Sequence, residues 1–113
     1  MAANNRQYNS VLVTGTTATT RSVVANADNG SLKVNQITCR NTTAGAITVY
    51  FYIKSDTVTT GTIYPIDSVS VGANTTEIIT KMLNHIVPNG GSIQAYDSSG
   101  AANYVTVSCS EFR

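Results

Sequence analysis

The side chains that could perform acid–base or nucleophilic chemistry are few in this chain. There is one histidine, His85, with six carboxylates, and no serine or cysteine lies in a nucleophile-elbow context. Such catalysis requires an acid, a base or a nucleophile held within hydrogen-bonding reach of the others, and no spacing here predicts that arrangement. We therefore expect no catalytic residues, and we interpret His85 as a surface or cap-region histidine.

Metal and cofactor sites are not predicted either. A zinc site needs three or four close ligands, whereas the single histidine and the two cysteines are widely separated in sequence. A contiguous calcium loop is also not predicted, because the loop carboxylates are far apart: Asp56, Asp67 and Asp97. We expect no cofactor and no metal.

The two cysteines, Cys39 and Cys109, fall on the apolar parity of their segments, so both are expected in the core. They are either reduced thiols or a disulfide, and a bridge would require Cα atoms within about 7 Å of each other. In a chain without a secretory signal, buried thiols are the more common outcome. The sequence favours reduced thiols and leaves the bridge open.

The residues 46–54 contain the longest run of strand-favouring side chains, and a two-residue period divides them into two faces. The core face carries Ile47, Val49, Phe51 and Ile53. The other face carries Tyr50 and Tyr52, whose side chains suit a half-wet surface or an interface. Three roles stay open for them: packing within the chain, a subunit interface, or a carbohydrate platform. We take both as candidate interface residues.

The N-terminal residues 1–9 are polar and show no periodicity, which predicts a flexible arm, either a frayed terminus or a segment that orders on a partner. Arg6 and Tyr8 are its candidate interface residues, because Arg and Tyr are enriched in protein–protein interfaces. The remaining residues, 10–113, have the length of a single domain.

Short alternating segments separated by turn residues, about ten positions apart, fill that domain. This pattern is typical of an all-β antiparallel sandwich or small jelly roll, here with about 7–9 strands. Residues 28–30 and the loop 41–45 each predict a hairpin between the flanking strands. Between Leu32 and Cys39 the apolar positions change from even to odd, which predicts either a bulge or the start of a strand near Asn35 and Gln36.

The amino-acid composition indicates which classes of partner the chain can bind. Charged residues make up 12% of the chain and the formal net charge is +1, so the polarity is mostly uncharged. Scattered Lys and Arg do not provide the basic patch that nucleic acid binding needs, and we expect no nucleic acid partner. No membrane span and no secretory signal are predicted, which favours synthesis in the cytoplasm. A weakly charged Thr/Ser/Asn surface suits a subunit that packs against other protein.

Two parts of the chain, residues 34–44 with 47–49 and residues 83–88 with 91–95, resemble small phage-encoded β-sandwich proteins of the virion. The shared pattern is a strand, an Asn-Thr-Thr turn at Asn41, an alternating strand, and later a strand of the form Gly-x-x-Ile-x-Ala beginning near Gly91. The resemblance covers residues 32–113. It implies a non-enzymatic structural protein of a tailed phage.

The resemblance further implies a capsid cement or decoration subunit on the virion surface, made in the host cytoplasm. Its partner would be the major capsid protein, and proteins of this kind often form homotrimers at symmetry axes. The alternative is a neck or tail accessory module, or a module that binds a host glycan.

Overall fold

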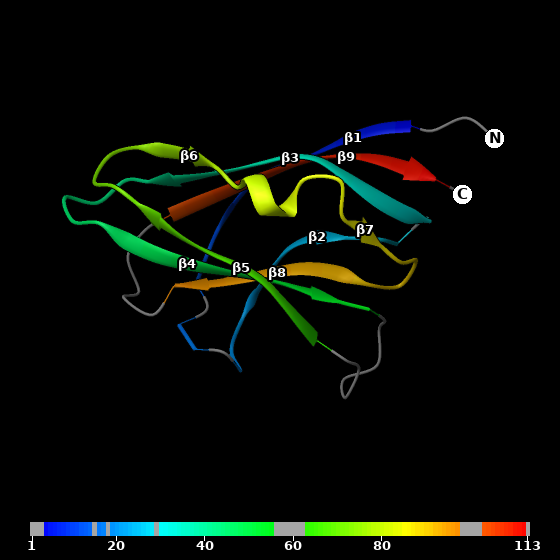
Figure 1. Cartoon of the computed structure of the whole chain (residues 1–113), viewed down its shortest axis with the longest axis horizontal. Helices are drawn as coiled ribbons and strands as arrows, with labels where there is room; N and C mark the ends of the chain where they lie inside the picture. Colours follow the sequence, from blue (N-terminus) through cyan, green and yellow to red (C-terminus); the bar gives the residue numbers. More distant parts are fainter. Residues whose placement is uncertain are drawn as a thin grey trace.

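Two antiparallel sheets pack face to face in this chain (Figure 1). The structure, a computed structural model, describes residues 4–14, 16–17, 19–28, 30–55, 63–97 and 103–112, with side chains from Ser10 onward. The described elements are β1 (Asn4–Leu12), β2 (Ser22–Asn26), β3 (Ser31–Asn41), β4 (Ile47–Lys54), β5 (Ile63–Val71), β6 (Thr76–Ile78), the 3₁₀ helix η1 (Thr80–Met82), β7 (Ile86–Val87), β8 (Ser92–Asp97) and β9 (Asn103–Phe112).

The strand order is that of a jelly roll. One sheet runs β1-β9-β3-β6, with β7 also paired to β3, and the other runs β2-β8-β4-β5. The first strand thus pairs with the last, β2 pairs with β8, β3 with β6 and β7, and β4 with β5. This is a long antiparallel hairpin folded over into two layers. The predicted all-β antiparallel sandwich is confirmed.

Strand β4 lies inside its sheet, between β8 and β5. Its alternation matches the prediction, because the odd-numbered apolar side chains are buried and the even-numbered ones are half-buried. In the other sheet, β9 buries Val105, Val107 and Cys109. Core side chains of this size each contribute roughly 1.5–3 kcal/mol when fully buried. The two inner faces therefore form one continuous core.

The predicted change of parity in β3 is confirmed. Val34 and Ile37 are both buried, and the register with β9 shifts between Val34 and Gln36. A bulge inserts one extra residue, so the apolar positions on either side of it return to the same face. The strand can therefore bury side chains along its whole length.

The two predicted hairpins are wrong. The strands on either side of loop 41–45, β3 and β4, lie in different sheets, as do β2 and β3. Turn residues indicate where the chain reverses, but they do not decide whether the next strand pairs or crosses to the other layer. Both edges of β3 are occupied by strands distant in sequence, β9 on one side and β6 and β7 on the other.

The expected flexible arm over residues 1–9, with a domain from residue 10, differs from the structure, in which β1 already begins at Asn4. Its backbone pairs with β9, and Arg6 and Tyr8 stand opposite Cys109 and Val107. Backbone hydrogen bonds of a ladder do not depend on side-chain polarity, so a polar segment can still add an edge strand. Residues 1–3 lie outside the described part.

Candidate functional site

Aromatic side chains gather on the outer face of the four-stranded sheet. We call Arg21, Tyr50, Tyr52, Gln94 and Tyr96 the tyrosine face. Tyr50 and Tyr96 stand opposite each other on β4 and β8, and Tyr52 stands opposite Gln94. The rings of Tyr50 and Tyr96 stack with centroids 4.6 Å apart and planes 12° apart, while those of Tyr52 and Tyr96 are 5.9 Å apart.

The Tyr50 and Tyr96 rings are stacked along the direction perpendicular to the strands, because the two residues are cross-strand neighbours. Neighbouring strands lie about 4.8 Å apart, which nearly equals the separation of the Tyr50 and Tyr96 rings. Offset aromatic pairs of this kind contribute roughly 0.5–1.5 kcal/mol beyond the area that they bury. The two rings therefore hold each other upright on the sheet.

Arg21 completes the tyrosine face, because it contacts both Tyr52 and Gln94. Its guanidinium carbon lies 5.4 Å from the ring centroid of Tyr52, a cation–π distance, and its Nε donates to Oε1 of Gln94 at 2.8 Å. The pKa of Tyr96 is raised, first by desolvation and then by the neighbouring Tyr52 hydroxyl. The face is thus an ordered set of rings with polar tips.

A groove lies between this stack and the edge strand β5. Its volume is about 360 Å³, and it is lined by Tyr50, Tyr52, Pro65, Ile66, Asp67, Ser68 and Lys81. We call it the β5 groove. Pro65 lies on this edge strand, and the register shifts here, because Phe51 pairs with Asp67 and Tyr52 with Pro65. Proline cannot donate a ladder hydrogen bond, which favours an irregularity at this point.

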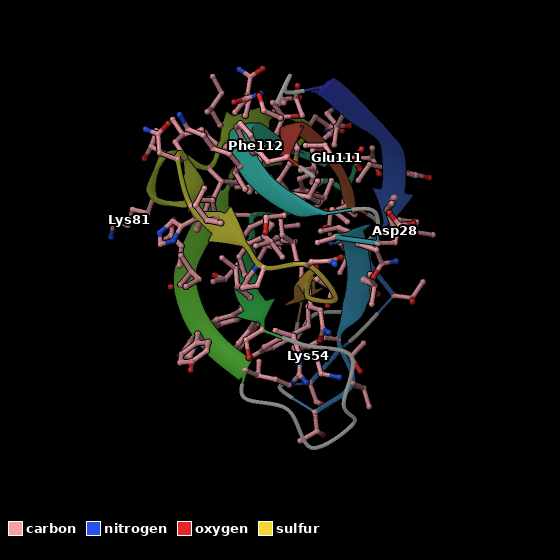
Figure 2. The ribbon with its side chains drawn as sticks, turned by 90° about the vertical axis from the view of Figure 1, so that its right-hand side faces the viewer. Asp28, Lys54, Lys81, Glu111 and Phe112 are labelled. Carbon is pink, nitrogen blue, oxygen red and sulfur yellow. The ribbon has the colours of Figure 1, made fainter. Side chains whose placement is uncertain are left out.

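The polar groups of the β5 groove come from two elements. Asp67 Oδ1 accepts the backbone N–H of Ser68 at 2.8 Å and lies 3.9 Å from Lys81 Nζ. The Asp67 side chain is 6% exposed, while that of Lys81 on η1 is 76% exposed and projects away from the ribbon in Figure 2. The groove thus has a fixed carboxylate and an adaptable ammonium.

A second set of exposed side chains crosses the outer face of the five-stranded sheet. Leu12, Tyr104, Arg40 and Thr76 follow one another across β1, β9, β3 and β6, and we call them the outer row. Leu12 is 42% exposed and Tyr104 39%. Arg40 Nη1 donates to Thr76 Oγ1 at 3.5 Å. The row combines aliphatic, aromatic and guanidinium groups without a carboxylate.

The predicted interface residues therefore divide between the two sheets. Tyr50 and Tyr52 come together on the four-stranded sheet, whereas Arg6 and Tyr8 belong to β1 of the other sheet, and their side chains lie outside the described part. The interface role of all four stays a prediction. Tyr96 was not among the predicted interface residues. Its position could have been inferred, because Ile93 and Ala95 are buried and Tyr96 therefore falls on the outer face of β8.

Both cysteines are buried, and neither forms a disulfide. Cys39 stands opposite Val105 on the adjacent strand, whereas Cys109 stands opposite Val34 at the other end of the same ladder. Four residues along a strand span roughly 13 Å, which exceeds the reach of a disulfide. Cys39 Sγ donates to Asn103 Oδ1 at 3.7 Å, and Asn103 Nδ2 donates to Asp97 Oδ2 at 3.2 Å. The Cys39 thiol is thus the last member of a series of buried, hydrogen-bonded side chains that runs through Asn103 to Asp97.

Alkaline pH is expected to destabilise the protein through Cys39. Burial, and secondly the Asp97 charge, raise the pKa of this thiol from 9.0 to about 12. Between these values the unfolded chain loses the proton while the folded chain keeps it, so the free energy of unfolding falls as pH rises. By the middle of this window the loss is about 2 kcal/mol.

Urea denaturation of the wild type and of Cys39→Ala across this pH range measures that contribution. The variant should lose less stability than the wild type as pH rises. Parallel losses in the two proteins would show that the thiol does not titrate as described.

Two residues considered in the sequence analysis remain, His85 and Asp56. His85 is half-buried and lines an apolar pocket of about 230 Å³ with Ile53, Tyr64, Ile86 and others. Asp56 lies outside the described residues. Among those described, no three His, Cys, Asp or Glu side chains come close enough to hold a metal ion. In the same part of the chain, no helix has the length and apolarity needed to span a membrane.

Comparisons with known proteins add little to this geometry. No protein-family model matches the chain, and no curated protein matches it. A solved crystal structure of a protein named PirA aligns over 96% of this chain and 93% of its own, with 13% sequence identity and a TM-score of 0.39. At that TM-score and identity, the likeness supports no conclusion about this chain.

Proposed function

We propose that the chain is a non-enzymatic structural subunit of a tailed-phage virion, which decorates the capsid by binding across major capsid protein subunits. The resemblance of residues 32–113 to small virion proteins is one support. The jelly roll is compatible, because this fold occurs in viral capsid and lectin domains, although a fold alone does not decide function. The observation that carries the proposal is the outer row.

The outer row has the composition of a protein-binding surface. Interface cores are enriched in Tyr and Arg and depleted in carboxylates, and they concentrate affinity in a few large side chains. Tyr104 and Leu12 are neighbours across β9 and β1, with Arg40 on the other side of Tyr104. Hydroxyl groups surround them, including the Ser10 and Thr106 pair at 2.6 Å. Few charges would have to be desolvated when this face docks.

Attachment to the shell is expected to depend on the outer row. Leu12→Glu and Tyr104→Glu each place a carboxylate in the proposed contact and should lower capsid occupancy at least tenfold, because an unpaired buried charge costs several kcal/mol. Purified protein is added to shells of the encoding phage assembled without this gene product, and bound protein is measured after sedimentation. Val23→Glu is the matched control, since Val23 is 44% exposed on the opposite sheet.

Wild-type occupancy by both outer-row variants would refute docking through this face, and failure of the wild type to bind would refute the decoration role. Cryo-electron microscopy of the particles tests the rest of the proposal. Density over the whole shell, as homotrimers at symmetry axes, is the expected result. Density at one vertex or on the tail alone would instead support the neck or tail accessory role.

A further inference from the structure

We propose that the β5 groove binds a neutral saccharide, a function beyond attachment to the capsid. The groove is lined by residues of β4 and β5 in the four-stranded sheet and by Lys81 of η1, and it shares no residue with the outer row, which lies on the five-stranded sheet. Its volume of about 360 Å³ falls within the range of small-ligand pockets, which is about 300–1,000 Å³. A subunit docked through the outer row would leave this groove open to solvent.

The aromatic wall of the groove is held in place before any ligand arrives. One face of the Tyr50 ring is covered by Tyr96 from β8. Since β4 lies between β8 and β5, the opposite face of that ring is turned toward the groove, which Tyr50 lines. Arg21 and Tyr96 restrain Tyr52 in the same way. A fixed ring face suits the apolar C–H face of a pyranose, because stacking on it removes apolar area from water at little entropic cost.

The opposite wall supplies hydrogen-bonding groups of both kinds. The Asp67 carboxylate accepts, the Lys81 ammonium donates, and the Ser68 hydroxyl can do either. Two neighbouring hydroxyl groups of a sugar can donate to the carboxylate and accept from the ammonium at once. The Lys81 side chain is largely exposed, so it can move to meet a bound ring without loss of packing.

Charge balance argues for a neutral ligand. Asp67 Oδ1 and Lys81 Nζ are 3.9 Å apart, and the other lining residues are uncharged. An anionic ligand would meet the fixed carboxylate, and a cationic ligand would meet the ammonium. A polyol satisfies both groups without an added charge, whereas an aliphatic peptide side chain would leave them unpaired at a cost.

Saturation-transfer NMR on the purified full chain tests this inference. The probes are the methyl glycosides of glucose, galactose, mannose and N-acetylglucosamine, with cellobiose and lactose. At least one should receive saturation at its ring C–H protons and bind with a Kd on the order of millimolar. Tyr50→Ala and Asp67→Asn should each weaken it about tenfold. Tyr104→Ala, with the same residue type on the other sheet, should bind as the wild type does.

Three outcomes would overturn the proposal. One is no binding of any probe at tens of millimolar. Another is unchanged binding in both groove variants, provided that their thermal unfolding matches that of the wild type. The third is tighter binding of glucuronate or inorganic phosphate than of every neutral probe. The assay uses no capsid, so its failure would leave the decoration role standing, and loss of capsid docking would leave this result unaffected.

Discussion

Replacement of Gly91 by alanine is expected to lower the free energy of unfolding by about 3 kcal/mol, because there is no room for a Cβ atom. An ideal Cβ at this position would lie 2.4 Å from the carbonyl oxygen of Lys54 and 3.0 Å from that of Pro88. Both atoms belong to the backbone, so neither can rotate away. Figure 2 looks onto this end of the sandwich, where Lys54 is labelled.

The surrounding hydrogen bonds explain why the backbone cannot simply move. The Gly91 carbonyl accepts from Ala27 N at 2.9 Å, its N–H donates to the Pro88 carbonyl at 2.8 Å, and Lys54 pairs with Ser92 in the ladder between β4 and β8. Relief of the clash would separate two strands or open the turn. The glycine therefore permits a close approach of three chain segments.

Urea denaturation followed by circular dichroism measures this effect. The matched control is Gly45→Ala, because a Cβ there would meet nothing within 4 Å. That variant should be neutral or stabilised by up to about 1 kcal/mol, through reduced entropy of the unfolded chain. Equal stability of the two variants would contradict the steric explanation.

Replacement of Asn41 by alanine should also cost roughly 3 kcal/mol, since it removes a buried amide that makes five hydrogen bonds, one of them to the buried carbonyl of Val71. The Asn41 side chain is fully buried, and its Nδ2 donates to three carbonyls: Gly45 at 2.8 Å, Val71 at 3.2 Å and Gly72 at 3.1 Å. Its Oδ1 accepts from the N–H and the hydroxyl of Thr43. One amide thus joins the loop after β3 to the loop after β5.

A second substitution separates hydrogen bonding from shape. Asn41→Asp keeps the side-chain outline but replaces the donor by an ionised acceptor facing three carbonyls, so it should destabilise at least as much as alanine. Asn35→Ala is the control, because Asn35 is exposed and makes one side-chain bond, to Ser110 Oγ at 2.9 Å. A small loss for both Asn41 variants, comparable to that of the control, would show that the amide is dispensable.

The role of Asn41 was only partly visible in the sequence. The Asn-Thr-Thr tract predicts a turn, which is correct, but it also suggested a hairpin, which is wrong. The difference arises because the Asn41 amide is used across the molecule, on the loop before β6, as well as within its own turn. Turn chemistry is local, whereas the choice of sheet depends on which distant strands occupy the free edges of β3.

The tyrosine face and the outer row could likewise be predicted from the sequence only in part or not at all. The alternation of β4 predicts that Tyr50 and Tyr52 share an outer face, and this is correct. It cannot predict that Tyr96 from β8 and Arg21 complete that face, because strand neighbours in a jelly roll are far apart in sequence. The outer row could not be predicted for the same reason, as Leu12 and Tyr104 come from the first and last strands.

The sequence alone determined the all-β class, the buried face of β4, the change of parity in β3 and the inward cysteines, because each depends on a period of two along one segment. Only the tertiary structure decided which strands are neighbours. That pairing separated Cys39 from Cys109, made residues 4–12 an edge strand, and set Asp67 and Lys81 beside the tyrosines. Side-chain alternation is a property of single strands, whereas a groove or a row across a sheet is made by strands whose contacts no local pattern encodes.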